Sequence, residues 1–389
     1  MRLYSIVLST LMTISAFGAE KKVITPAGAR APVGPYSPGI MAGDYLYVSG
    51  QGAAKPDGSF PETAGLQTEQ CLNNVKAIVE GAGLTMGHVV YAHLYLKDIT
   101  AYEDANRVWA KFFPKDGPAR AIVGVTKMPT DTPVEVTVVA VRDLSRRKVI
   151  PGGVMVGDRL YLAGSIGEVS GDPAQQVQSA LDAMGKTLKS AGMDFRHMVF
   201  VNPYLTDKMP MDVMNKVYAK HFEFGNTPAR ATIKVASLPN GGNIEFTGVA
   251  IRDLSKRIAV RPKNMPPSPT ASPCVFAEDT FYCSAKAGFI PGPNSGIYAS
   301  TVETQVQQTM RNLLDGLEEA GLTFADVVAT NVYLDDINDF AKMNKTYAQY
   351  FSGAPPTRTT VQQYPSAERK ANEQERWPTL EQISIIAVK

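Results

Sequence analysis

The sequence Gly117-Pro118-Ala119-Arg120 recurs twice in this chain, as Thr227-Pro228-Ala229-Arg230 and as Pro356-Thr357-Arg358. After each of the first two arginines, an alternating apolar run leads to a glutamate fifteen positions later, Glu135 and Glu245. Copies this far apart are whole domains rather than solenoid units. The sequence therefore predicts three tandem domains with up to three equivalent sites, and the arginines are the best indication of function.

Each copy shows the same order of expected elements. The first has extended runs over 33–41 and 45–50, helices over 68–80 and 101–113, and strands over 89–96, 121–126 and 134–141. Apolar residues recur at helical spacing in the helices and alternate in the strands. The order β-β-α-β-α-β-β predicts an α+β fold in which two helices cover one face of each sheet. Three such sheets around a pseudo-threefold axis would bury their other faces, so we predict an intramolecular pseudo-trimer that is a monomer in solution.

Length and composition suit three soluble domains. We predict domains over 23–146, 147–257 and 268–389, with polar or proline-rich linkers over 142–148 and 252–269. The third copy also carries a charged insertion over 366–377, which we expect to be a solvated loop.

Residues 1–19 are typical of a signal peptide, with a basic start, an apolar stretch and small residues at its end. The alternative is a membrane anchor, but the run is broken by serine and threonine and is shorter than a span requires. The mature protein is therefore predicted to be periplasmic or secreted, with no membrane attachment after cleavage.

The charge pattern gives no reason to expect nucleic acid as a partner, because the formal net charge is only +2. The four histidines are scattered and show no metal-site spacing, so we expect no metal. Counting outward from the expected hairpin turn at Glu278-Asp279 places Cys274 opposite Cys283. A cross-strand disulfide there suits an oxidising compartment, and two buried thiols are the alternative. Cys71 falls on an apolar helix stripe and is expected in the core.

Five runs closely resemble the RidA/YjgF family: 34–39 (GPYSPG), 48–51 (VSGQ), 72–78 (LNNVKAI), 118–120 (PAR) and 134–136 (VEV). The resemblance covers essentially all of the first copy and the helix-strand-helix region and arginine strand of the other two. It implies a chorismate-mutase-like fold. It also implies clefts between subunits, where 2-imino acids or their enamine tautomers are hydrolysed to 2-oxo acids and ammonia without a cofactor.

The resemblance also implies roles for particular residues. The arginines expected to bind the substrate carboxylate are Arg120, Arg230 and Arg358, and the site glutamates are Glu135 and Glu245. In the third copy the glutamate position is Gln382, because Glu381 is one residue off and would face the opposite side of its strand. The expected substrate-binding residues are Tyr36, Ser49, Gly50, Asn106, Asn215, Asn344 and Ser284.

Several positions depart from the family pattern. Ile150 and Ala271 replace the tyrosine, and the Ser-Gly pair becomes Ala163-Gly164 and Ser284-Ala285. A cysteine that many members carry two positions after the arginine is replaced by Ile122, Thr232 and Thr360. The most complete set groups Tyr36, Ser49, Gly50 and Asn106, while the repeat that supplies the facing arginine and glutamate stays open. The alternative is that the asparagines only cap helix ends and that Tyr36 is only a half-buried aromatic.

The residue types fit hydrolysis of a 2-imino acid. An arginine fork binds and orients a planar carboxylate, and a nearby glutamate can orient water or take its proton. The alternative is a non-catalytic scaffold that binds small carboxylates or protein partners through partly degenerate clefts. RNA cleavage, which the family resemblance also allows, is least consistent with the near-neutral charge.

Overall fold

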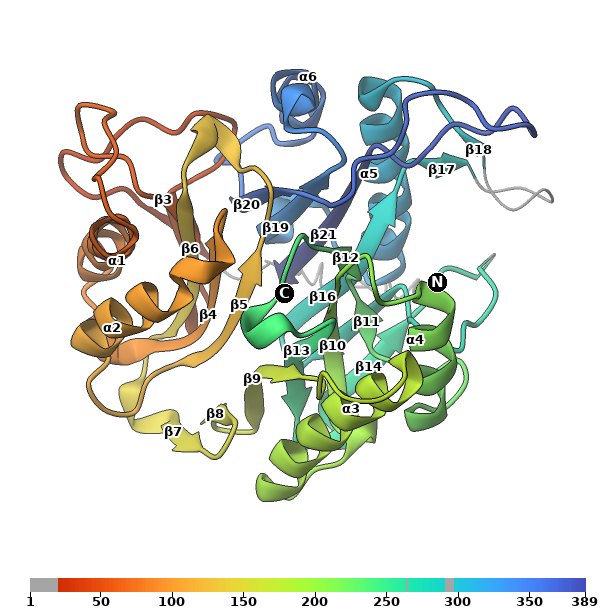
Figure 1. Ribbon diagram of the computed structural model, residues 1–389, viewed down its shortest axis with the longest axis horizontal. Helices are drawn as coiled ribbons and strands as arrows, with labels where there is room; N and C mark the ends of the chain where they lie inside the picture. The colour runs from red at the N-terminus through yellow and green to blue at the C-terminus, as the bar shows by residue number, and fades with distance from the viewer. Residues whose placement is uncertain (1–19, 264, 291–296) are drawn as a thin grey trace, which may run out of the picture.

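The structure is a computed structural model that describes residues 20–263, 265–290 and 297–389. Residues 1–19, the predicted signal peptide, lie outside the described residues. Three sheets occupy the centre of the molecule, and the helices lie around the outside in three pairs (Figure 1). The predicted α+β pseudo-trimer is therefore confirmed.

The helices and strands repeat in the same order three times. Repeat 1 contains β1 (Lys21–Ile24), β2 (Gly39–Ala42), β3 (Tyr45–Gly52), α1 (Ala64–Gly81), β4 (Val89–Leu96), α2 (Tyr102–Phe112), β5 (Ala119–Gly124) and β6 (Val134–Val141). Repeat 2 contains β7 (Arg147–Ile150), β8 (Gly153–Val156), β9 (Arg159–Ile166), α3 (Pro173–Ser190), β10 (Met198–Leu205), α4 (Met211–Tyr218), β11 (Ala229–Arg230), β12 (Ile233–Lys234) and β13 (Ile244–Ile251). Repeat 3 contains β14 (Arg257–Val260), β15 (Cys274–Ala277), β16 (Thr280–Ala287), β17 (Phe289–Ile290), β18 (Ile297–Tyr298), α5 (Val302–Glu319), β19 (Val327–Leu334), α6 (Phe340–Tyr347), β20 (Thr357–Gln362) and β21 (Glu381–Val388).

Each repeat begins with a short edge strand that the sequence pattern did not predict. In repeat 1 the strand order is β1-β2-β3-β6-β4-β5, and repeat 3 has the matching order β14-β15-β16-β21-β19-β20. The strands β7 and β14 lie partly or wholly in segments expected to be linkers. The sequence pattern did not reveal these two strands, because each is only four residues long and half-exposed. Basic side chains such as theirs are common in edge strands. The order of elements is therefore β-β-β-α-β-α-β-β.

Two kinds of hydrophobic core hold the molecule together. Each repeat packs its two helices on one face of its own sheet, as Leu72 and Val75 of α1 do against Val136 of β6. The other faces of the three sheets meet in one shared core. The equivalent tyrosines Tyr47, Tyr161 and Tyr282 are buried there. Because that core draws on all three repeats, no repeat can bury its inner sheet face alone.

The predicted cysteine arrangement is confirmed. Cys274 and Cys283 are Cα partners in the β15–β16 pair and form a disulfide. Glu278, in the turn between them, has a positive φ of 61°, as a tight hairpin turn requires. Cys71 is a buried free cysteine.

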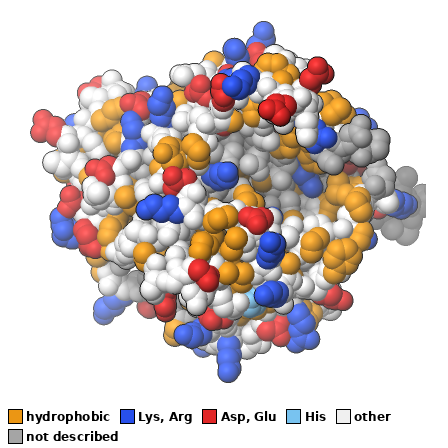
Figure 2. Space-filling view, turned by 45° about the vertical axis from the view of Figure 1, so that its right-hand side comes forward, with side chains coloured by type: hydrophobic (Ala, Val, Ile, Leu, Met, Phe, Trp, Pro, Cys, Tyr) orange, Lys and Arg blue, Asp and Glu red, His pale blue; other side chains and the backbone are white. Residues whose placement is uncertain are grey.

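The surface matches the balanced composition. Figure 2 shows acidic and basic side chains interspersed over the face that it draws. Among the described residues, no helix is long and apolar enough to cross a membrane.

Candidate functional site

The three repeats pair in a cycle, and each pairing brings the arginine strand of one repeat against the sheet of another. Strand β20 packs on β3, β5 packs on β9, and β11 packs on β16. We call the resulting sites cleft A (repeats 1 and 3), cleft B (repeats 2 and 1) and cleft C (repeats 3 and 2). The sequence left this pairing open, and the structure decides it.

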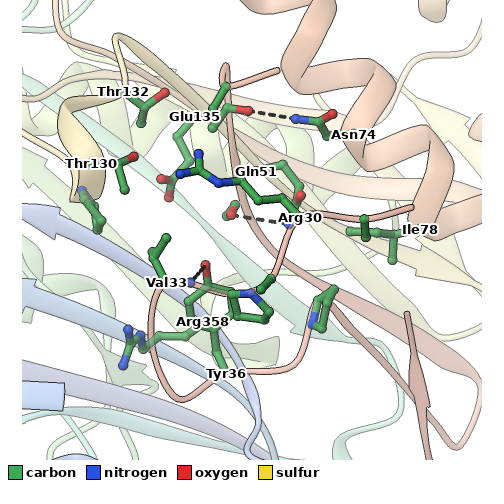
Figure 3. Close-up of a pocket in the computed structure, with 18 of the residues that line it drawn as sticks. Arg30, Val33, Tyr36, Gln51, Asn74, Ile78, Thr130, Thr132, Glu135 and Arg358 are labelled. Atoms are coloured by element: carbon green, nitrogen blue, oxygen red, sulfur yellow. Dashed lines mark hydrogen bonds between the residues drawn. The ribbon is translucent and has the colours of Figure 1, made fainter. Parts of the chain in front are cut away.

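Cleft A contains a pocket of about 240 Å³. Repeat 1 contributes Tyr36 and Glu135 to its lining, and repeat 3 contributes Arg358 (Figure 3). Gly50 of repeat 1 and Thr360 of repeat 3 also line the pocket. The carboxyl group and the arginine predicted from the sequence therefore face one pocket from two different repeats.

The hydroxyl group of one buried serine, Ser49, links the two repeats that form cleft A. The Ser49 hydroxyl donates to the carbonyl oxygen of Ser37 (2.6 Å) and accepts a hydrogen bond from the backbone N–H of Arg358 (2.8 Å). Ser284 makes the same contacts in cleft C, donating to Ser272 O (2.6 Å) and accepting from Arg230 N (2.8 Å). Both serine side chains are buried. Their hydrogen bonds hold the backbone of each arginine at a fixed position along the neighbouring sheet.

Each arginine lies over an aromatic ring of its own repeat. The guanidinium carbon is 4.5 Å from the Trp109 centroid for Arg120, 5.1 Å from Tyr218 for Arg230 and 5.2 Å from Tyr347 for Arg358. Arg358 also lies 5.2 Å from the rings of both Tyr36 and Phe340. These contacts hold a guanidinium in place while leaving its N–H groups free to bind a carboxylate.

The aromatic partners were missed by sequence reasoning, although the sequence holds a signal for them. Trp109, Tyr218 and Tyr347 each lie three residues after the repeated asparagine, on the same face of the second helix. An aromatic residue at this spacing in every copy distinguishes the position from an ordinary core residue.

The asparagines lie beside the arginines within their own repeats. Asn106 Oδ1 accepts a hydrogen bond from Arg120 Nη2 (2.6 Å), and Asn215 Oδ1 accepts one from Arg230 Nη1 (2.8 Å). The grouping of Asn106 with Tyr36 was therefore wrong, because Asn106 lies in cleft B. Asn344 takes its place in cleft A. Its amide and Arg358 Nη2 both lie close to Gly34, at 3.0 and 2.6 Å from the position that a β-carbon there would occupy.

Arg358 is the buried cation of cleft A. It is 4% exposed, and both its Nη1 and Nη2 lack a hydrogen-bond partner in the described part of the chain. Burial lowers the pKa of Arg358, with opposing contributions from Tyr347, Tyr36 and Glu135. Unpaired guanidinium donors in a buried site are costly, and an anionic ligand in the pocket would satisfy them.

Glu135 is the carboxyl group of the same pocket and is 6% exposed. Burial raises the pKa of Glu135 to about 8, although Arg358 opposes the rise. Gly50 leaves the space that this carboxyl group occupies, because a β-carbon at Gly50 would lie 2.0 Å from Glu135 Oε1. At neutral pH the pocket therefore combines a mostly protonated acid with a charged arginine.

Cleft B keeps the acid–arginine pair but loses the tyrosine and serine. Glu245 is 2% exposed, and burial raises its pKa to about 8. A hydrogen bond from the backbone of Ile122 and the charge of Arg120 oppose that rise. Gly164 makes room as Gly50 does, since a β-carbon there would lie 1.7 Å from Glu245 Oε1.

Cleft C has lost its acid. Gln382 pairs with Tyr333 as Glu135 pairs with Tyr95, so it occupies the glutamate position, as predicted. Glu381 lies on the helix side of β21, where Thr309 donates a hydrogen bond to its Oε1. Ala285 replaces the glycine that makes room for the carboxyl group in the other clefts. Arg230 and Asn215 remain in cleft C, so carboxylate-binding groups persist without the acid.

A covering segment, residues 25–38 between β1 and β2, distinguishes cleft A from cleft B. Its residues 26–33 line the pocket, and the Val33 N–H donates a hydrogen bond to the Tyr36 hydroxyl (3.3 Å) (Figure 3). In repeat 2, only Pro151 and Gly152 separate β7 from β8, so no such segment is present. The insertion at 366–377 contributes no residue to the lining of the cleft A pocket.

The described residues contain no cluster of His, Cys, Asp and Glu side chains able to hold a metal ion. The polar groups that line the cleft A pocket are arginine, carboxyl, tyrosine, threonine, amide and backbone groups.

Comparisons with known proteins agree with this architecture. The family model described as Endoribonuclease L-PSP matches residues 27–142, 150–252 and 265–365. A RutC family protein of Saccharolobus solfataricus is 40% identical over 124 residues, covering 31% of this chain and 97% of that protein. The 2-iminobutanoate/2-iminopropanoate deaminase of Escherichia coli K12 is 37% identical over 125 residues, covering 31% of this chain and 98% of that enzyme.

Among solved structures, the YjgF gene product of Escherichia coli is 36% identical, with a TM-score of 0.30, over 31% of this chain and 99% of that one. The RutC family protein and the deaminase therefore each correspond to a single repeat. Because the family model matches three times and covers most of the sequence, the chain belongs to the RidA/YjgF family and carries three tandem copies of its domain.

Proposed function

We propose that this protein hydrolyses 2-imino acids to 2-oxo acids and ammonia, with cleft A as its principal site. The observation that carries the proposal is the arrangement of Arg358 and Glu135 across one pocket. Arg358 offers unpaired, buried donors to a carboxylate, and Glu135 offers a titratable oxygen close by. The deaminase named among the relatives is consistent with this chemistry.

In the proposed reaction the substrate is an iminium carboxylate, R–C(=NH₂⁺)–COO⁻. Arg358 binds the carboxylate through two N–H groups, which orients the C=N bond toward Glu135. The positive charge of the bound iminium lowers the pKa of Glu135 and favours its ionised form. Glu135 then takes a proton from water as the water oxygen bonds to C2, which gives a carbinolamine, and it returns that proton to the nitrogen. The C–N bond breaks as the C2 hydroxyl becomes the C=O group, and the proton of that hydroxyl passes through Glu135 to the departing ammonia. The products are R–CO–COO⁻ and NH₄⁺.

Cleft B is proposed to work more slowly, because it keeps Glu245 and Arg120 but has no tyrosine and no covering segment. Cleft C is proposed to bind carboxylates without hydrolysing them, because Gln382 can neither take nor give a proton at neutral pH. This second activity, carboxylate binding, is favoured in cleft C by the retained Arg230 and Asn215.

The test is release of ammonia from 2-iminopropionate generated by an amino-acid oxidase, corrected for uncatalysed hydrolysis. Wild type is compared with Arg358→Gln, Arg120→Gln and Arg230→Gln, each checked for folding by circular dichroism. A charge-assisted contact contributes about 1.5–3 kcal/mol, so Arg358→Gln should reduce kcat/KM about 10- to 100-fold. Arg120→Gln should have a smaller effect. Equal activity of wild type and Arg358→Gln would refute the assignment of cleft A.

We also propose that the protein acts as an exported monomer. The shared axial core already joins three repeats within one chain, and the Cys274–Cys283 disulfide suits an oxidising compartment. Light scattering should give a mass close to that of one chain, 42.0 kDa before processing. A trimeric mass, or an intact N-terminus on protein recovered from the cell, would contradict the respective part of this proposal.

A further inference from the structure

We propose that Arg30 makes cleft A selective for 2-imino acids that carry a second carboxylate, which it binds while Arg358 binds the carboxylate next to the imine. This inference rests on the proposed function and specifies the substrate class of the same site. It starts from the charged residues of the pocket.

The cleft A pocket is lined by two arginines and one carboxyl group. Among its lining residues, only Arg30, Arg358 and Glu135 have acidic or basic side chains. Because burial raises the pKa of Glu135 to about 8, that group carries little negative charge at pH 7. The side chains of the pocket therefore have a net positive charge close to two, whereas a monocarboxylate neutralises only one of the two arginines.

The two guanidinium groups approach the pocket from different sides. Arg358 enters from β20 of repeat 3, beside Tyr36, while Arg30 extends from the covering segment across the side that holds Glu135 and Thr130 (Figure 3). A ligand with a carboxylate at each end would therefore place the reacting carbon between the arginines and close to Glu135.

Arg30 is available for a ligand. It is an exposed residue, and no carboxylate of the described residues forms an ion pair with it. Its guanidinium lies near Gly58, because Arg30 Nη2 is 3.8 Å from the position that a β-carbon on that glycine would occupy. Arg30 thus lines the pocket and extends from the covering segment toward the loop that carries Gly58.

The backbone that carries Arg30 is tied to the site. Within the covering segment, the Val33 N–H donates a hydrogen bond to the Tyr36 hydroxyl. The segment is joined to repeat 3 next to Tyr36, because the Ser37 N–H donates a hydrogen bond to the carbonyl oxygen of Pro356 (3.1 Å). Burial raises the pKa of Tyr36, and the charges of Arg358 and Arg30 both act to lower it. The Tyr36 hydroxyl therefore lies within electrostatic reach of both cations.

The second carboxylate takes no part in bond making. The water oxygen still bonds to C2, the C–N bond breaks and ammonium leaves, while Arg30 orients the far end of the substrate. The oxidation of aspartate or glutamate at the α-carbon yields imines of this class, and the products are 2-oxo dicarboxylates.

The test compares the imines made by oxidation of aspartate and of alanine as substrates, in wild type, Arg30→Gln and Arg30→Lys. The measured quantity is the ratio of kcat/KM for the dicarboxylate to kcat/KM for the monocarboxylate. We expect Arg30→Gln to lower that ratio at least fivefold and Arg30→Lys to retain much of it. Arg107→Gln, an exposed arginine of α2, is the matched control and should leave the ratio unchanged. An unchanged ratio in Arg30→Gln overturns the inference.

A binding measurement keeps this inference separate from the proposed function. If wild type accelerates neither imine, the proposed hydrolysis fails, and calorimetry with 2-oxoglutarate and 2-oxobutyrate then decides the role of Arg30. Tighter binding of the dicarboxylate that is lost in Arg30→Gln supports the inference. Equal binding of the two acids by wild type overturns it.

Discussion

Glu381 offers the clearest test of how this structure assigns neighbouring residues to opposite faces of a strand. It is fully buried on the helix side of β21, where repeats 1 and 2 have Val134 and Ile244. Its Oε1 accepts a hydrogen bond from Thr309, and its Oε2 has no partner among the described residues. The substitution Glu381→Gln keeps the shape of the side chain and removes its titration.

The size of the expected stability change follows from the pKa of Glu381. Burial raises this pKa from 4.5 to about 8, and the hydrogen bond from Thr309 opposes the rise. Between these two pH values the folded state binds more protons than the unfolded state, so the free energy of unfolding falls as pH rises. At 1.36 kcal/mol per pKa unit, ionisation costs at most about 4 kcal/mol at pH 8 and about 1 kcal/mol at pH 5. We therefore compare the free energy of unfolding of Glu381→Gln with that of wild type at each pH. The variant's advantage should be larger at pH 8 than at pH 5, by up to about 3 kcal/mol.

Urea denaturation followed by circular dichroism at pH 5 and pH 8 measures this difference. Glu318→Gln, on the exposed face of α5, is the matched control and should show no comparable dependence on pH. A stability difference between Glu381→Gln and wild type that is the same at both pH values would refute the assignment of Glu381 to a buried, uncompensated position.

Three further predictions concern the site and the disulfide. Glu135→Gln should remove the rise of kcat/KM near pH 8, where Glu135 of the free enzyme ionises, and should lower kcat at least tenfold, as steady-state rates from pH 6 to 9 would show; a kcat/KM profile unchanged from wild type contradicts the role of Glu135. Gly50→Ala should displace the Glu135 carboxyl group and lower kcat about tenfold. Gly164→Ala, measured in the same assay, should have a smaller effect because it alters cleft B. A larger effect of Gly164→Ala would mean that cleft B, and not cleft A, is the principal site. Reduction of the Cys274–Cys283 disulfide should lower the free energy of unfolding by about 2–3 kcal/mol, and peptide mapping that finds both thiols free in the oxidised protein would contradict the bridge.

Local patterns in the sequence were sufficient for most of the fold. The helices begin and end within four residues of the predicted bounds in repeat 1, because apolar spacing and turn residues are local signals. The same local logic separated Gln382 from Glu381, since neighbouring residues of a strand point to opposite faces. Local patterns did not predict β1, β7 and β14. These edge strands are short and half-exposed, and their apolar and polar residues do not alternate clearly.

The candidate site was predictable residue by residue but not as an assembly. Arg358 and Glu135 were both identified from sequence, yet nothing local indicated that they share a pocket. Asn106 was placed with Tyr36 because both belong to the first repeat, whereas the structure pairs it with Arg120 in cleft B. The role of Ser49 in joining two repeats also depends on contacts across 309 positions of sequence.

The sequence by itself determined that there are three copies of one α+β domain, which residues stand at each equivalent position, and that Cys274 faces Cys283. These are properties of periodicity and register, which neighbouring residues set. Only the tertiary structure decided that repeat 1 meets the arginine of repeat 3, and that cleft A alone combines Tyr36, Glu135 and a covering segment. The reason is that either cyclic order of the repeats satisfies the same local pattern, and the packing of three inner sheet faces into one core selects between them.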